Sequence, residues 1–100
     1  MTRVADTPHI MLIDAMFGEF VPSWEEPIGP VIHPNKAGAV AEVDEFLAGV
    51  RKDMGEDAHS EYRTQTTVEP IVVEGKGKQA RYTIRGQVYT FAQLRKMAGH

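Results

Sequence analysis

The sequence predicts a single α+β domain with a three-stranded antiparallel sheet, one long amphipathic helix and short N- and C-terminal helices. Three observations predict this class. Apolar residues recur with helical spacing between residues 36 and 54, and β-branched residues and turn signals alternate between residues 66 and 89. The chain has 100 residues, of which 42 % are hydrophobic and 25 % charged, which is typical of one globular domain, so residues 1–100 are assigned to one unit.

The first element is expected to be a short helix that begins at Thr7 and Pro8. A Thr side chain caps free backbone N–H groups, and Pro fits the first helical position. The apolar run from Ile10 would lie on this helix, and Gly18 would end it. A buried strand over His9–Asp14 is the competing interpretation, because a short apolar run is compatible with both structures.

Residues 18–35 contain four prolines and are expected to form a Pro-rich loop, because Pro disrupts helix interiors and central strands. This loop holds the only tryptophan, Trp24, followed by Glu25 and Glu26. One interpretation, which we favour, is that Trp24 pins the loop to the core. The other is that Trp24 is an interface anchor with an acidic rim, since Trp dominates many binding interfaces.

The long amphipathic helix is expected between Asn35, a suitable N-cap, and Gly55, a suitable end. Its apolar side chains recur at spacings of 3, 4, 3 and 4 residues, which places Val40, Val43, Leu47, Val50 and Met54 on one stripe. That stripe is predicted to face the core.

Acidic residues dominate the outer face of this helix and the segment after it, since residues 42–61 carry seven acidic and two basic side chains. A solvated face is the favoured interpretation, and an acidic binding surface is the alternative. The candidate partner-binding residues of that surface are Glu42, Glu45, Glu56, Asp57 and Glu61.

The C-terminal third predicts strands over Thr66–Val73, Ala80–Ile84 and Gln87–Tyr89, followed by a helix. Pro70 within the first strand indicates an edge or a bulge. Thr90 caps the final helix, with Gln93 completing a capping box. In the tighter register of the second turn, Tyr82 faces Tyr89, a pair that stabilises hairpins.

Charge is distributed unevenly along the chain. Residues 1–74 carry all fourteen acidic and five basic side chains, a net charge of −9, whereas residues 75–100 carry six basic side chains and no acid, a net charge of +6. We call residues 75–100 the basic module, a hairpin followed by a helix; its candidate binding residues are Lys76, Lys78, Arg81, Arg85, Arg95 and Lys96. Basic side chains interleaved with Tyr82, Tyr89 and Phe91 are typical of a nucleic-acid contact, but these charges are slightly better explained by pairing with the acidic part of the same chain.

No residue pattern predicts catalysis, a metal or a cofactor. The chain has no Cys, its four His residues show no metal-ligand spacing, and neither Ser lies in a nucleophile motif. The Gly-rich segment of residues 75–79 lacks the spacing and the following helix of a phosphate-binding loop, so a hairpin turn is expected there. The sequence therefore predicts a non-enzymatic protein.

The segment Arg81–Leu94, RYTIRGQVYTFAQL, resembles the hairpin and first helix that open helix-turn-helix domains of phage and mobile-element proteins. The resemblance covers 14 residues and does not include a recognition helix.

The whole-chain profile is similar to that of small phage-encoded inhibitors of the anti-CRISPR type: about a hundred residues, no Cys, net acidic, mixed α and β. This resemblance implies a protein that binds a host nucleoprotein complex, such as a CRISPR surveillance complex, and blocks its nucleic-acid-binding surface. The alternative is a small nucleic-acid-binding accessory protein that acts through the basic module. Either protein is expected in the cytoplasm, that of a bacterial host if phage-encoded, without a membrane contact, because the apolar run at Ile10–Ile13 is too short for a signal or spanning segment.

Overall fold

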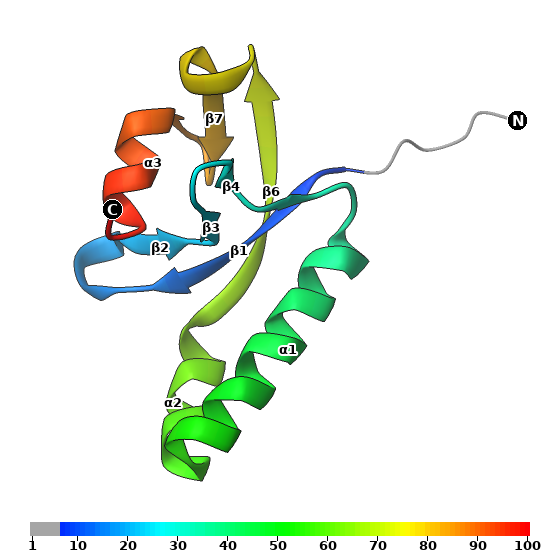
Figure 1. The fold of residues 1–100 in the computed structure, drawn as a ribbon, viewed down its shortest axis with the longest axis vertical. Helices are drawn as coiled ribbons and strands as arrows, with labels where there is room; N and C mark the ends of the chain where they lie inside the picture. Colours follow the sequence, from blue (N-terminus) through cyan, green and yellow to red (C-terminus); the bar gives the residue numbers. More distant parts are fainter. Residues whose placement is uncertain (1–6) are drawn as a thin grey trace, which may run out of the picture.

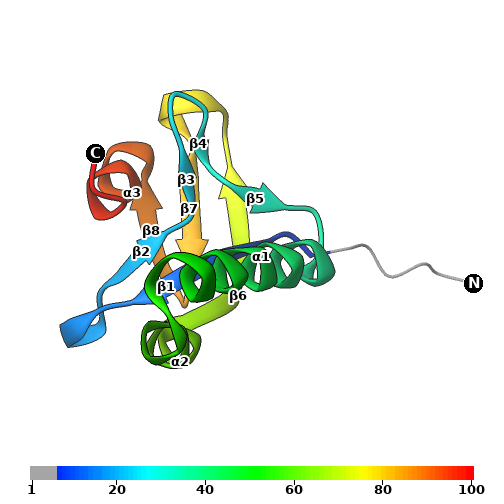
Figure 2. The same ribbon diagram turned by 60° about the horizontal axis from the view of Figure 1, so that its bottom comes forward.

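A curled antiparallel sheet separates two helices from a third in the computed structural model, which describes residues 7–100 (Figures 1 and 2). The strands are β1 (His9–Asp14), β2 (Phe20–Pro22), β3 (Trp24–Glu25), β4 (Gly29–Pro30), β5 (Ile32–His33), β6 (Thr66–Glu74), β7 (Arg81–Ile84) and β8 (Gln87–Thr90). The helices are α1 (Lys36–Met54), α2 (Glu56–Gln65) and α3 (Phe91–Met97), with 3-10 turns η1 (Met16–Gly18) and η2 (Gly77–Gln79).

The sheet has six strands in the order β2-β1-β6-β7-β8, and β5 pairs with β1 beside β2. The long strand β6 joins two halves, because residues 66–70 pair with β1 and residues 71–74 pair with β7. The sheet curls until its two end strands approach each other. The rings of Phe20 in β2 and Tyr89 in β8 contact edge to face, with centroids 5.6 Å apart.

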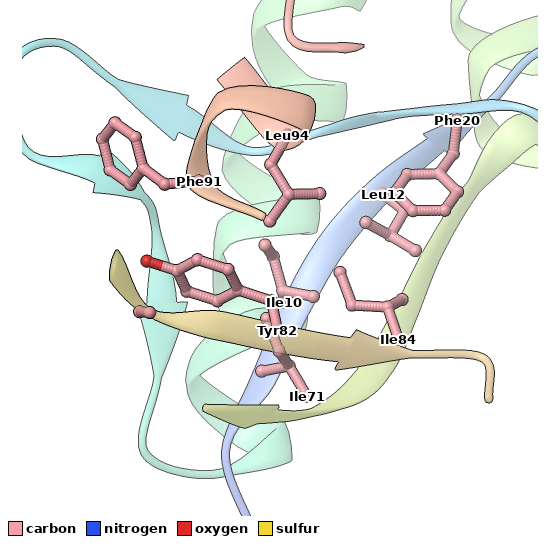
Figure 3. Packing of buried hydrophobic residues seen from close by; sticks show 9 residues of the cluster. Ile10, Leu12, Phe20, Ile71, Tyr82, Ile84, Phe91 and Leu94 are labelled. Atoms are coloured by element: carbon pink, nitrogen blue, oxygen red, sulfur yellow. The ribbon is translucent and has the colours of Figure 1, made fainter. Parts of the chain in front are cut away.

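The inner face of the sheet carries the main core, which α3 covers (Figure 3). Its largest fully buried side chains come from three strands and α3: Ile10, Leu12, Ile71, Ile84 and Leu94. Successive strand residues point to opposite faces, so Met11, between Ile10 and Leu12, faces outward. There α1 packs on β1 and β6 and buries Ala39, Leu47 and Val50.

Three predictions about the fold are confirmed at residue level. Asn35 caps α1 through a 2.9 Å hydrogen bond from the Gly38 N–H, and α1 ends before Gly55. Tyr82 is paired with Tyr89 across the β7–β8 hairpin. Thr90 and Gln93 form the predicted capping box at the start of α3.

Several predictions are wrong. The favoured N-terminal helix is strand β1, the competing interpretation, because β6 pairs with one edge and β2 and β5 with the other. The Pro-rich loop of residues 18–35 contains four short strands, and the sheet has six strands in place of three. Pro22 and Pro30 are tolerated because these strands are only two or three residues long. Helix α2 was not predicted, since residues 56–65 carry no apolar stripe.

Candidate interaction surfaces

The acidic surface comprises exposed carboxylates on α1 and α2. Glu45, Asp57 and Glu61 are exposed and form no ion pair among residues 7–100. Asp44 and Asp53 are also exposed and belong to the same helix pair, although the sequence analysis did not single them out. The predicted acidic residues are thus spread over two helices joined at Gly55.

Helix α2 is attached mainly to α1 and buries none of its side chains. The Tyr62 ring contacts the Phe46 ring edge to face, with centroids 5.8 Å apart. Arg51 and Glu56 form an ion pair, with Arg51 Nε 2.9 Å from Glu56 Oε1. Both side chains are more than half exposed, so this pair contributes little stability.

Glu42 does not belong to the acidic surface, because its carboxylate is partly buried and paired within the fold. It accepts a hydrogen bond from the Ser23 hydroxyl at 2.5 Å and contacts His33 Nε2 at 2.6 Å. Gly38 allows His33 to pack closely against α1, since a Cβ there would lie 3.2 Å from the His33 side chain, a tight contact. The Glu42 carboxylate therefore holds both Ser23, between β2 and β3, and His33, in β5, against α1.

Trp24 packs against the core, as the favoured interpretation predicted. Of the two acidic residues that follow it, Glu26 forms an ion pair, whereas Glu25 forms none among the described residues. The Trp24 ring is half-buried, 5.0 Å from the Phe91 ring centroid. Glu26 pairs with Arg95 at 2.8 Å, and this hydrogen bond is the main reason that the pKa of Glu26 lies below its ordinary value. The Trp24 indole N–H also lowers that pKa, although the geometry falls outside that of a normal hydrogen bond.

Arg85 is used inside the fold. Its guanidinium bonds Asp14 at 2.7 Å, donates to the Thr67 hydroxyl at 3.0 Å and lies 3.7 Å from Glu69. The hydrogen bond to Asp14 raises the pKa of Arg85. The guanidinium also lies 5.6 Å from the centroid of the Phe20 ring, so Arg85 ties β1, β2 and β6 to the β7–β8 turn.

The remaining basic residues are exposed and form no ion pair within the described part of the chain: Lys76, Lys78, Arg81 and Lys96. The aromatic rings interleaved with them are withdrawn from solvent. Tyr82 is 5 % exposed and Phe91 9 % exposed, while Tyr89 is half-buried against Phe20. Because the rings are buried or half-buried, they are not placed to stack on nucleic-acid bases. The exposed residues of the basic module that could contact nucleic acid are therefore its Lys and Arg side chains.

A feature that the sequence analysis missed is the tip of the β1–β2 hairpin. Met16 and Phe17 lie in η1 and are exposed, beside a surface hollow of about 580 Å³. Met16 and Phe17 could be recognised as a hairpin tip only if the residues on either side were assigned to strands, and the favoured prediction for this segment was a helix.

Among residues 7–100, no group of three or more His, Asp or Glu side chains is placed to hold a metal ion. No helix within the same residues is both long enough and apolar enough to span a bilayer. Comparisons with protein-family models, curated proteins and solved structures gave no match to this chain.

Proposed function

We propose that this protein is a non-enzymatic interaction protein that binds a basic surface of a protein partner through the acidic surface of α1 and α2. The observation that carries the proposal is that α2 buries no side chain yet presents Asp57 and Glu61 to solvent. A helix that adds so little to the core has another use, and a rigid row of carboxylates complements a groove lined by Lys and Arg.

The sharper form of the proposal is that the partner is a host nucleoprotein complex. Carboxylates on a rigid helix pair imitate the charge of a nucleic-acid backbone, so they compete for a groove that binds nucleic acid. The resemblance to small phage-encoded inhibitors supports this form, in which the protein blocks target binding by occupancy and transforms no substrate.

The alternative function is direct nucleic-acid binding through the basic module. Exposed Lys76, Lys78, Arg81 and Lys96 favour it, whereas the burial of Tyr82 and Phe91 disfavours it. Four phosphate contacts predict a logarithmic salt slope of roughly −3 to −4 on duplex DNA.

A pair of charge-reversed variants tests the proposal. The acid-reversed variant replaces Glu45, Asp57 and Glu61 with Lys; the matched control replaces Lys76, Lys78 and Arg81 with Glu. Neither set makes an ion pair among the described residues, so both variants are expected to fold like wild type by circular dichroism.

Each protein is immobilised and used to capture partners from bacterial lysate, and its binding to DNA and RNA is measured by electrophoretic mobility. We expect the acid-reversed variant to lose the captured complex and the control to retain it. Retention by the acid-reversed variant together with loss by the control, or tight binding of bare nucleic acid, would contradict the proposal and favour the alternative.

A further inference from the structure

The turn η1 places a large aromatic side chain in water on strained backbone. Phe17 is 95 % exposed, and its neighbour Met16 is 74 % exposed. The backbone of Phe17 lies at φ 63°, in the left-handed region that a bulky residue rarely adopts. Strained backbone is concentrated at functional and binding sites, so an exposed aromatic ring held on strained backbone beside a second exposed apolar side chain indicates a contact site.

The hollow beside Phe17 has a mainly apolar lining, with Gln87 as a polar member, and opens at the seam of the curled sheet. Phe20 and Tyr89 line it from β2 and β8, and Met97 lines it from the end of α3. Strands β2 and β8 are the two ends of the strand order and do not pair with each other. With a volume of about 580 Å³, the hollow is large enough to accept an aromatic side chain.

Two opposite charges border the same hollow. Glu19 follows the hairpin tip and Lys96 lies near the end of α3. Both are exposed, and neither forms an ion pair with any residue among residues 7–100. This small surface thus carries an apolar projection, an apolar recess, an anion and a cation.

We infer that a second copy of this chain occupies the hollow and that the protein forms a two-fold symmetric dimer. A two-fold contact uses the same surface on both subunits, so each feature must find its complement within that surface. Phe17 of each subunit enters the hollow of the other, and Glu19 of each subunit pairs with Lys96 of the other. A surface with only one sign of charge would instead repel its own copy.

The dimer does not depend on the proposed function, because the acidic surface shares no residue with the hollow. Glu19 and Lys96 line the hollow, whereas Glu45, Asp57 and Glu61 do not. Loss of dimerisation and loss of partner capture are therefore separate measurements on separate variants.

Sedimentation equilibrium of wild type, Glu19→Lys and Lys96→Glu, alone and mixed, tests the inference. Wild type is expected to shift from monomer to dimer mass as its concentration rises. In a dimer of either single variant, residues 19 and 96 of opposite subunits carry the same charge at both symmetric contacts. Each single variant is therefore expected to dimerise at least about tenfold more weakly than wild type. An equimolar mixture of the two variants restores both attractive pairs, so the mixture is expected to form a heterodimer.

The inference is overturned if wild type stays monomeric at every concentration, or if the mixture associates no better than its components. Dimerisation that is unchanged in both single variants also overturns it, since the contact would then lie elsewhere. Phe17→Ser is expected to weaken the dimer about tenfold or more. Ile28→Ser is the matched control, because Ile28 lies between β3 and β4, is 72 % exposed and does not line the hollow.

Discussion

The two faces of the sheet are built in different ways. The inner face closes on α3 with five large side chains less than 2 % exposed. The buried side chains of the outer face are Met11, Leu47 and Val50, each 6 to 9 % exposed, and the small Ala39. Even α1 leaves Val40 and Met54 on its apolar stripe exposed. The inner face therefore supplies most of the stability, and the outer helices are free to carry charges that have no structural role.

The largest difference is expected from truncating an inner-face residue. Ile84 is fully buried between β6 and β8, so Ile84→Ala leaves a cavity that its rigid neighbours cannot fill. We expect a loss of roughly 4 kcal/mol in the free energy of unfolding, measured by urea denaturation. A loss below about 1 kcal/mol would show that the inner face is loosely packed.

The corresponding outer-face truncation is Leu47→Ala in α1. Leu47 is 9 % exposed and lies at the boundary with solvent, so its cavity partly refills. We expect a loss of about 2 kcal/mol, clearly smaller than for Ile84. Glu45→Ala is the control on the exposed face of the same helix and should leave stability nearly unchanged. Equal losses at positions 47 and 84 would remove the distinction between the two faces.

Sequence patterns predicted the elements whose signals are local, and missed those that depend on distant partners. The cap at Asn35, the capping box at Thr90 and the Tyr82–Tyr89 pair follow from neighbours within a few residues. Strand β1 was not favoured because its identity depends on pairing with β6, more than fifty residues away.

The candidate sites divide in the same way. Exposure of Glu45 follows from its position on the predicted helix α1, and so could be predicted, whereas Glu61 lies on α2, which was not predicted. The internal use of Glu42, Arg85 and Arg95 depends on partners 9 to 71 residues away in the sequence. The hollow beside Phe17 arises only when the curled sheet brings β2 close to β8.

A smaller effect is expected at the hairpin tip, which belongs to neither packed face. Phe17 has positive φ and almost no buried surface, so Phe17→Gly removes strain and few contacts within the subunit, while Phe17→Ala keeps the strain. We expect the Gly variant to be about 1 kcal/mol more stable than the Ala variant, measured by denaturation at low protein concentration. Equal stability of the two would mean that the tip relaxes to another conformation.

The smallest effect concerns the ion pair that joins α3 to the segment after Trp24. The folded-state pKa of Glu26 is lowered below its ordinary 4.5, chiefly by the hydrogen bond from Arg95. The pair therefore stabilises the protein above pH 4.5, and its contribution is lost as the pH falls through the lowered pKa. Arg95→Gln removes this contribution, so its stability should fall less than that of wild type on acidification from neutral pH. Arg81→Gln, which removes an Arg without an ion pair among the described residues, should follow wild type. Because both Glu26 and Arg95 reach solvent, the expected difference is small. Parallel acid titrations of wild type and Arg95→Gln would show that this ion pair does not contribute to stability.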